Sequence, residues 1–281
     1  MPFKILKKQE LVPTIYQMDI SAPRIAKKAQ PGQFVILRID EKGERIPLTI
    51  ADFDRDKGTI TMIFQAVGKT TTHLSSLKAG DELLDFIGPL GNPAHIENIG
   101  TVVLVGGGVG VAPVFPQARA FRDAGNKVIS IIGARSAALL LWEDRMREVS
   151  DDLYITTDDG TKGHHGFVTD IVKKLLEDGT KVDRVVAIGP PVMMRAVAGV
   201  TRPFNVKTIV SLNSIMVDGT GMCGACRVLV GNETKFACVD GPEFDAHLVD
   251  FTLLMNRLAM YQPEEKLALE KYKCEREGCK C

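Results

Sequence analysis

The sequence of 281 residues is long enough for two domains of ordinary size and a small appendage. Its 35 basic and 35 acidic residues balance, which excludes the strongly basic surface of a nucleic-acid-binding or membrane-surface protein and favours a small-molecule or protein partner. No run forms a signal peptide or approaches the ~20 apolar residues of a membrane span, and six cysteines are too few for a disulfide scaffold, so we expect a protein of the reducing cytoplasm.

Residues 1–98 consist of short runs rich in Val, Ile, Leu and Phe, separated by turns such as PGQ and KAGD. Runs of this length with turn residues between them predict strands, and their succession predicts a small antiparallel β-barrel. One helix is expected here, from the segment TTTHLSSLKAG, because its threonines can cap the free N–H groups of a first turn.

From residue 99 the pattern changes to apolar runs that alternate with helical segments. TVVLVGGGVGVAPVFPQARAFRDAGNKVISIIGARS contains an apolar run, a glycine loop, a helical segment and a second apolar run, which together predict a β-α-β unit. Three more apolar runs follow, with helical segments between them. This alternation predicts a doubly wound α/β domain with a parallel sheet over residues 99–205.

A glycine-rich loop separates the first strand of this domain from its first helix. Backbone N–H groups and a helix dipole can face a pyrophosphate there, although tight packing alone also explains such glycines. The loop residues expected to bind a nucleotide are Gly107, Gly108, Val109 and Gly110.

The second strand ends at Ala134 and Arg135 rather than at an acidic residue, and the loop is not G-x-G-x-x-G, so a standard Rossmann dehydrogenase is disfavoured. Arg135 can pair with an adenosine 2′-phosphate or flank the pyrophosphate, which leaves NAD and NADP both open.

Two later turns lie where strands end, and ligands of doubly wound sheets bind at that edge. The first holds Asp158 and Asp159, for which a solvated turn is the alternative. The second holds Gly189 and Pro190, followed by Met193, which can equally be a core residue of the next helix. We expect all five to contribute to the cofactor site.

Residues 206–261 contain the pattern D-x4-C-x2-C-x11-C, formed by Asp218, Cys223, Cys226 and Cys238. Plant-type [2Fe–2S] sites use C-x4-C-x2-C with a distant fourth cysteine, so these four residues are the expected ligands, with aspartate in the first position. Glycines around the cysteines allow the backbone to wrap closely around a cluster. A zinc site or three buried structural cysteines are the alternatives.

The region from residue 242 to 261 is expected to be weakly helical. The tail over residues 262–281 is charged and contains Cys274, Cys279 and Cys281. These cysteines are too few for a four-thiolate site, so we expect a mobile tail, with a metal or partner contact as the alternative.

A β-barrel, a GGGVGVAP domain and a four-ligand cluster segment, in this order, resemble the ferredoxin–NADP reductase superfamily, in its branch with a C-terminal [2Fe–2S] segment. The resemblance implies FAD in the barrel, NAD(H) at the glycine loop, hydride transfer between them and single-electron transfer between FAD and the cluster. No catalytic acid, base or nucleophile is implied, because the redox chemistry belongs to the cofactors.

Within this branch, electron-transfer subunits of dihydroorotate dehydrogenase carry four cysteines around the cluster. Asp218 therefore favours resemblance to the electron-bifurcating NADH-dependent ferredoxin:NADP oxidoreductases. This implies a heterodimer with a larger subunit that carries a second flavin and [4Fe–4S] clusters, and that serves ferredoxin and NADP(H). A role as the dihydroorotate dehydrogenase electron-transfer subunit is the alternative.

The resemblance also suggests flavin-binding residues. The family motif R-P-L-S corresponds to Pro47, Leu48 and Thr49, with Ile46 at the arginine position, and a contact between Arg45 and FAD stays open. A second motif, of the form V-G-x-G-T after a strand, places Ile63, Phe64, Val67, Gly68, Thr70 and Thr71 near the flavin and its phosphates, with barrel-core packing as the alternative for the first three. The family's cysteine before Gly189 is Ile188 here, so hydride transfer must proceed without that thiol.

Overall fold

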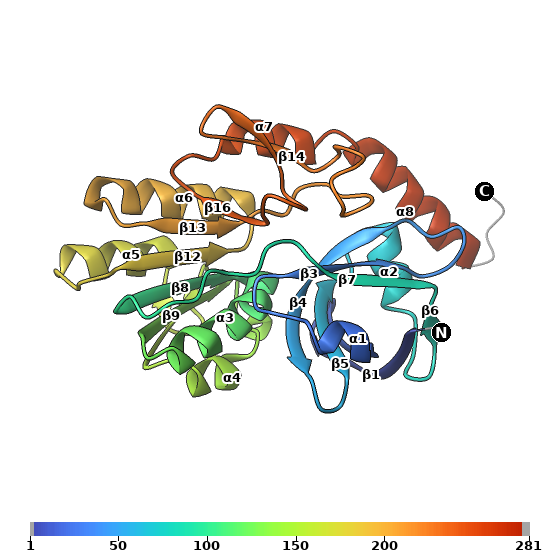
Figure 1. Cartoon of the computed structure of the whole chain (residues 1–281), viewed down its shortest axis with the longest axis horizontal. Coiled ribbons are helices and arrows are strands. Elements are labelled where there is room, and N and C mark those ends of the chain that lie inside the picture. The colour runs from blue at the N-terminus through green and yellow to red at the C-terminus, as the bar shows by residue number, and fades with distance from the viewer. Residues whose placement is uncertain (1–2, 277–281) are drawn as a thin grey trace.

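The computed structural model describes residues 3–276. Figure 1 shows a β-barrel beside an α/β domain, with the cluster segment and the last helix lying across both. The predicted fold class, a barrel followed by a doubly wound domain and a small C-terminal cluster segment, is confirmed.

The barrel is a nearly closed sheet of seven antiparallel strands in the order β6-β1-β2-β5-β4-β3-β7. Its strands are β1 (Phe3–Val12), β2 (Ile15–Ser21), β3 (Phe34–Arg38), β4 (Ile46–Asp54), β5 (Thr59–Gln65), β6 (Glu82–Leu83) and β7 (Asp85–Leu90). Alternate side chains such as Met18, Ile20, Ile60 and Met62 fill the barrel interior, as the two-residue period of a strand requires.

Two short helices accompany the barrel. Helix α1 (Pro23–Ala26) was not predicted, because four residues are too few to show a helical period. Helix α2 (Lys69–Leu74) is the expected one, although it is shorter than the predicted segment. The hydroxyl oxygen of Thr71 accepts the N–H groups of Val67 and Gly68, at 3.1 and 3.0 Å, and so holds the start of α2.

The α/β domain has a parallel sheet in the order β11-β10-β9-β8-β12-β13, with β16 added antiparallel at one edge. The strands are β8 (Thr101–Gly107), β9 (Lys127–Ala134), β10 (Asp152–Thr157), β11 (His164–His165), β12 (Arg184–Ile188), β13 (Thr208–Ser211) and β16 (Glu243–Asp245). The helices are α3 (Val111–Asp123), α4 (Glu143–Glu148), α5 (Val168–Glu177) and α6 (Pro191–Thr201). Because β8 has β9 on one side and β12 on the other, the glycine loop after β8 lies at the switch point of the sheet, where ligands bind.

Successive residues of β8 point to opposite faces of this sheet. Val102 and Leu104 pack with α3, whereas Val103 and Val105 pack with α5 and α6. The strands are therefore apolar on both faces, which is why they appear in the sequence as continuous apolar runs.

The C-terminal segment contains β14 (Arg227–Val230), β15 (Glu233–Phe236), α7 (Phe251–Leu258) and α8 (Gln262–Arg276). The expected helix over residues 242–261 was wrong in its first half, because residues 243–245 form β16 by pairing with β13. Helix α7 begins only after Asp250, whose carboxylate accepts the N–H of Leu253 at 2.8 Å.

The tail was expected to be mobile, but residues 262–276 form helix α8, which packs against α2 of the barrel. The rings of His73 and Tyr272 lie 5.4 Å apart at this contact. Cys274 is in the last turn of α8, and Cys279 and Cys281 lie outside the described residues.

Glu243 of β16 occupies the junction of all three parts of the chain. Its carboxylate accepts the side-chain N–H of Gln117 of α3 at 2.5 Å and lies close to Gly32 of the barrel. Burial raises the pKa of Glu243 to about 7, against a weaker opposite effect of the Gln117 hydrogen bond and of Arg184. The side-chain oxygen of Gln117 has no hydrogen-bond partner among residues 3–276. A protonated carboxyl can donate a hydrogen bond as well as accept one, so the neutral form of Glu243 suits a buried position where a neighbouring oxygen lacks a donor.

Replacement of Glu243 by glutamine should therefore change how stability depends on pH. The folded pKa lies above the ordinary value of 4.5, so the protein loses stability as pH rises from about 4.5 through 7 and the buried carboxyl ionises. Glu243→Gln cannot ionise, and its advantage over the wild type should grow by about 2–3 kcal/mol between pH 5 and pH 8.5. Thermal unfolding across this range measures the difference.

Glu233→Gln is the control, because Glu233 is exposed and the neighbouring Lys235 lowers its pKa. This variant should follow the wild-type curve closely. Parallel curves for Glu243→Gln and wild type from pH 5 to pH 8.5 would contradict a protonated Glu243.

Candidate functional site

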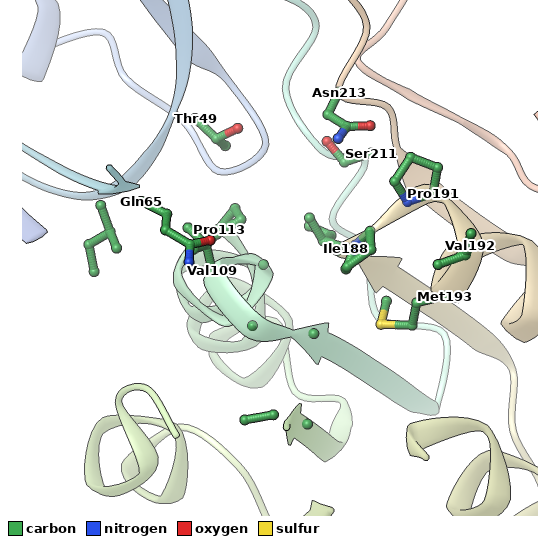
Figure 2. A pocket seen from close by; sticks show the side chains of 18 of the residues that line it. Thr49, Gln65, Val109, Pro113, Ile188, Pro191, Val192, Met193, Ser211 and Asn213 are labelled. Atoms are coloured by element: carbon green, nitrogen blue, oxygen red, sulfur yellow. The ribbon is translucent and has the colours of Figure 1, made fainter. Parts of the chain in front are cut away.

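A cavity of about 1040 Å³ lies where the barrel, the α/β domain and the first residues of the cluster segment meet. Figure 2 shows Thr49 on the barrel side, Ile188 and Pro191 on the α/β side, and Ser211 and Asn213 on a third side. Ligand pockets commonly measure ~300–1,000 Å³, so this cavity has room for a large cofactor.

All the predicted cofactor-binding residues except Gly68, Thr70 and Asp159 line this cavity. The hydroxyl of Thr70 instead donates to Glu44 at 2.6 Å, and the side chain is buried. Asp159 forms the solvated turn that was the alternative. Its carboxylate accepts the hydroxyl and the N–H of Thr161, and these bonds, the hydroxyl first, lower its pKa.

The barrel wall of the cavity is formed by Pro47, Leu48 and Thr49 of β4, by Ile63 and Phe64 of β5, and by Val67 and Thr71 at the start of α2. Arg45 is absent from the lining and lies 3.8 Å from the carboxylate of Asp85, which also binds Arg38 at 2.7 Å.

The glycine loop forms the opposite wall, and packing requires glycine at one of its positions. A Cβ at Gly110 would lie 2.1 Å from the backbone carbonyl oxygen of Ile188, at the end of β12. A Cβ at Gly107 would lie 2.4 Å from the sulfur of Met193, a flexible side chain that can shift. Tight packing therefore explains Gly110, and both glycines also line the cavity.

At Gly108 the backbone angle, rather than packing, favours glycine. Its φ is +55°, and a Cβ there would meet no heavy atom of residues 3–276 within 4 Å. Because Gly108 also lines the cavity, the space beside it is the part of the loop that a ligand can approach closely.

Gly108→Ala should therefore separate backbone strain from ligand exclusion. An alanine at positive φ destabilises the fold by ~1–2 kcal/mol, and its methyl group would enter the cavity. We expect NADH to bind at least ten-fold more weakly, measured by titrating the purified holoprotein.

Gly179→Ala is a matched control, since Gly179 has φ +77° and also has no heavy atom of the described chain within 4 Å of its Cβ position. It lies after α5 and outside the cavity lining. This variant should lose similar stability and bind NADH normally. Equal NADH affinity in both variants would mean that Gly108 does not face the nucleotide.

The ends of β9 and β10 meet at the cavity edge. The N–H of Asp158 donates to the carbonyl of Ala134 at 3.1 Å, and Arg135 and Asp158 both line the cavity. One cationic and one anionic side chain thus lie at the same edge, which does not by itself favour NADP over NAD.

The third wall of the cavity was not predicted. It is formed by Ser211, Leu212, Asn213, Ser214 and Met216, which follow the end of β13. These residues match no motif, but their position after a parallel strand of a doubly wound sheet is where ligands bind.

The four expected cluster ligands lie together as two pairs. The carboxylate of Asp218 accepts the N–H groups of Thr220 and Cys223 at 2.9 and 3.0 Å. These bonds, that of Thr220 first, lower the pKa of Asp218 and keep it ionised. The sulfurs of Cys226 and Cys238 lie 3.2 Å apart, both buried, whereas Cys223 is exposed.

Burial, and then the neighbouring thiol of Cys226, raise the pKa of Cys238 to about 12. Two such thiols become thiolates together only beside a cation, which a bound iron supplies. No three His, Cys, Asp or Glu side chains of residues 3–276 are grouped as a metal ion requires, so the assignment of these four residues as cluster ligands rests on their spacing in the sequence.

The glycines around these ligands have backbone angles that other residues rarely adopt. Gly219, Gly221 and Gly224 have φ of +76°, +87° and +67°. A Cβ at Gly219 would also lie 2.8 Å from Ile36 and from Leu90, so the cluster loop packs directly on the barrel. The expectation that small residues let this loop wrap closely agrees with these angles.

Comparison with known proteins identifies both functional domains. Residues 104–199 match the family described as oxidoreductase NAD-binding domain. Residues 213–250 match the iron–sulfur cluster binding domain of dihydroorotate dehydrogenase B. The fold and these matches define an oxidoreductase subunit of the ferredoxin–NADP reductase type, and they support the expected cofactors FAD, NAD(H) and [2Fe–2S].

Two relatives and one solved structure match nearly the whole chain. The dihydroorotate dehydrogenase B (NAD(+)) electron transfer subunit homolog of Thermotoga maritima is 49% identical over 269 residues, which cover 96% of this chain and 95% of that protein. The corresponding electron transfer subunit of Bacillus mycoides is 34% identical over 251 residues, which cover 85% and 94%. A structure of an NADH-dependent reduced ferredoxin-NADP oxidoreductase, described for its insights into flavin-based electron bifurcation, is 48% identical with a TM-score of 0.91 and covers 96% of this chain and 97% of its own.

The chain therefore belongs to the family of dihydroorotate dehydrogenase B electron-transfer subunits and their homologues. Phthalate dioxygenase reductase, at 15% identity and a TM-score of 0.58 over 82% of this chain and 86% of its own, shares the fold alone. Within residues 3–276, no helix has the length and apolar character needed to cross a membrane.

Proposed function

We propose that this chain is the NAD(H)-side electron-transfer subunit of a flavin-based electron-bifurcating NADH-dependent ferredoxin:NADP oxidoreductase. The observation that carries the proposal is Asp218 in the first ligand position of an otherwise cysteine-bearing loop that wraps as a cluster site should. The likeness at 48% identity to a structure described for electron bifurcation supports it.

In this proposal the barrel wall of the cavity binds the flavin, and the wall of the α/β domain binds the nicotinamide nucleotide. Thr49 offers a hydroxyl from the barrel for the flavin, and the N–H groups around Gly108 face the nucleotide pyrophosphate from the α/β side. The lining is mainly apolar, which excludes water and lets a nicotinamide lie against the flavin. When bound, FAD and NAD(H) supply the hydride chemistry, and the protein supplies orientation.

The chain also connects the cavity to the cluster loop. Leu212 and Met216 line the cavity and pack in the same buried core as Cys226 and Cys238. A flavin bound in the cavity would therefore lie against residues of the same buried core that contains two of the proposed cluster ligands.

A larger subunit is the proposed partner, with a second flavin and [4Fe–4S] clusters that serve ferredoxin and NADP(H). Exposed apolar side chains surround the cluster loop, namely Val217, Met222 and Val239, of which Met222 is 89% exposed. Exposed apolar side chains that form one patch are typical of a surface that binds another protein, and these three lie within 23 residues of one another around the proposed cluster ligands. The relatives' description as electron transfer subunits supports a partner of this kind.

The first experiment is a visible spectrum of anaerobically purified protein, with iron, zinc and flavin analysis, before and after NADH. We expect one FAD and two irons per chain and bleaching of the spectrum by NADH. A colourless protein that contains zinc would overturn the redox function.

A role in dihydroorotate oxidation is the second candidate, because residues 213–250 match the cluster domain of that enzyme. Co-purification separates the two. A large iron–sulfur flavoprotein as partner supports bifurcation, and a dihydroorotate dehydrogenase barrel as partner supports the second candidate.

Asp218→Cys tests the proposed ligand. A thiolate donates more electron density to iron than a carboxylate does, so the variant should keep two irons per chain and change the EPR spectrum of the reduced cluster. Asp218→Asn keeps an oxygen that can accept the loop N–H groups but lacks the negative charge, and it should lose iron. An EPR spectrum of Asp218→Cys that equals the wild type would mean that another donor holds that iron.

A further inference from the structure

Asp52 of β4 forms ion pairs with two arginines across the boundary between the barrel and the α/β domain. One carboxylate oxygen lies 2.8 Å from the guanidinium of Arg119 on α3, and the other lies 2.5 Å from that of Arg145 on α4. The Asp52 side chain is 15% exposed, so solvent screens these contacts less than it screens ion pairs on the open surface. The carboxylate therefore ties one strand of the barrel to two helices of the other domain.

Aromatic rings lie against both guanidinium groups. The guanidinium of Arg145 lies 4.1 Å from the ring centroids of Phe115 and of Trp142. That of Arg119 lies 5.2 Å from the centroid of the Phe115 ring. A cation is attracted to an aromatic face, and a planar guanidinium that stacks on a ring loses less freedom when it also binds a carboxylate. The bridge formed by Asp52, Arg119 and Arg145 is therefore restrained on its arginine side.

The elements that this bridge joins carry the walls of the two proposed cofactor sites. β4 supplies residues 47–49 to the cavity, and Asp52 follows three residues later on the same strand. Helix α3, which carries Arg119, starts directly after the glycine loop. Ala51 and Phe115 pack in one core across the domain boundary. A movement of α3 relative to β4 would therefore move the glycine loop relative to the flavin wall.

We propose that Asp52 is a positioning residue for hydride transfer, because its bridge to Arg119 and Arg145 sets the separation of the flavin wall from the nucleotide wall. The inference rests on the proposed function, since it requires FAD and NAD(H) on opposite walls. Transfer of a hydride oxidises NADH and reduces the flavin by two electrons. It needs reacting atoms about 3–3.5 Å apart, and a displacement of about 1 Å can slow a reaction about 100-fold. Asp52 is not among the residues that line the cavity, so it acts through the placement of the domains.

The test compares Asp52→Asn with wild type in the full-length holoprotein. Asparagine has nearly the same shape but no negative charge, so it cannot pair with both guanidinium groups. At saturating NADH, flavin reduction followed by anaerobic stopped-flow should slow about ten-fold or more. The long-wavelength absorption of a nicotinamide stacked on a flavin should weaken. The FAD content and the dissociation constant of NADH should not change, because Asp52 does not line the cavity.

Arg119→Gln and Arg145→Gln test the two ion pairs separately. The arginine side chains are 36% and 35% exposed, so both variants should fold. Each should slow flavin reduction less than Asp52→Asn does, because one ion pair remains. Arg119→Gln added to Asp52→Asn should cause no further loss of rate, since the bridge is already broken. Additive losses of rate would contradict an action through the bridge.

Glu143→Gln is the matched control. The carboxylate of Glu143 also lies between two cations, with Arg147 at 3.2 Å and Lys162 at 2.5 Å, and its side chain is 21% exposed. These three residues all belong to the α/β domain and lie outside the cavity lining. The variant should lose thermal stability as Asp52→Asn does and keep the wild-type rate of flavin reduction. An equal loss of rate in both variants would refute the inference, because general destabilisation would then explain it.

The outcomes distinguish the inference from the proposed function. Wild-type protein that binds no FAD, or whose flavin is not reduced by NADH, would refute the function and the inference together. Wild-type protein reduced by NADH, and an Asp52→Asn variant with unchanged rate and long-wavelength absorption, would refute the inference alone. A weaker affinity for NADH with an unchanged rate at saturation would also refute it, because Asp52 would then act on binding.

Discussion

The antiparallel pairing of β16 with β13 fixes how the three parts of the chain are arranged. β13 is the last parallel strand of the α/β sheet, and β16 returns after the cluster cysteines to pair Glu243 with Ser211. The two ends of the intervening loop therefore lie side by side, at a residue that lines the cavity. The pairing thus returns the chain, after the proposed cluster ligands, to the edge of the sheet beside the cavity.

The same pairing gives the cluster loop a second support. Gly219 lies against Ile36 and Leu90, so the loop touches the barrel while its ends are anchored in the other domain. Helix α8 adds a further link, since Tyr272 packs on His73 of the barrel helix α2. Electron transfer needs a fixed distance between redox centres, and these contacts hold the cluster ligands against both domains that form the cavity.

Much of the fold and of the candidate site could be predicted from patterns of residues that lie close together in the sequence. Apolar alternation, the glycine loop and the spacing of Asp218 and the three cysteines each depend on residues close in sequence. One error arose where a distant contact decides the structure, because residues 243–245 form a strand only where β13 offers an edge. The other concerned α8, whose Glu, Lys, Leu and Ala residues favour a helix by themselves, although the charged tail was expected to be mobile. The third cavity wall, including Ser214, follows no motif, and only the fold brings it to the site.

The carboxyl of Glu243 lies where the paired strands β13 and β16, the barrel and α3 meet, so its protonation affects the contacts among all three parts of the chain. Burial raises its pKa to about 7, and the side-chain N–H of Gln117 donates to it. A neutral carboxyl can donate as well as accept a hydrogen bond, whereas an ionised one can only accept. The junction is therefore most stable with the proton bound, and that stability is lost as pH rises from about 4.5 through 7.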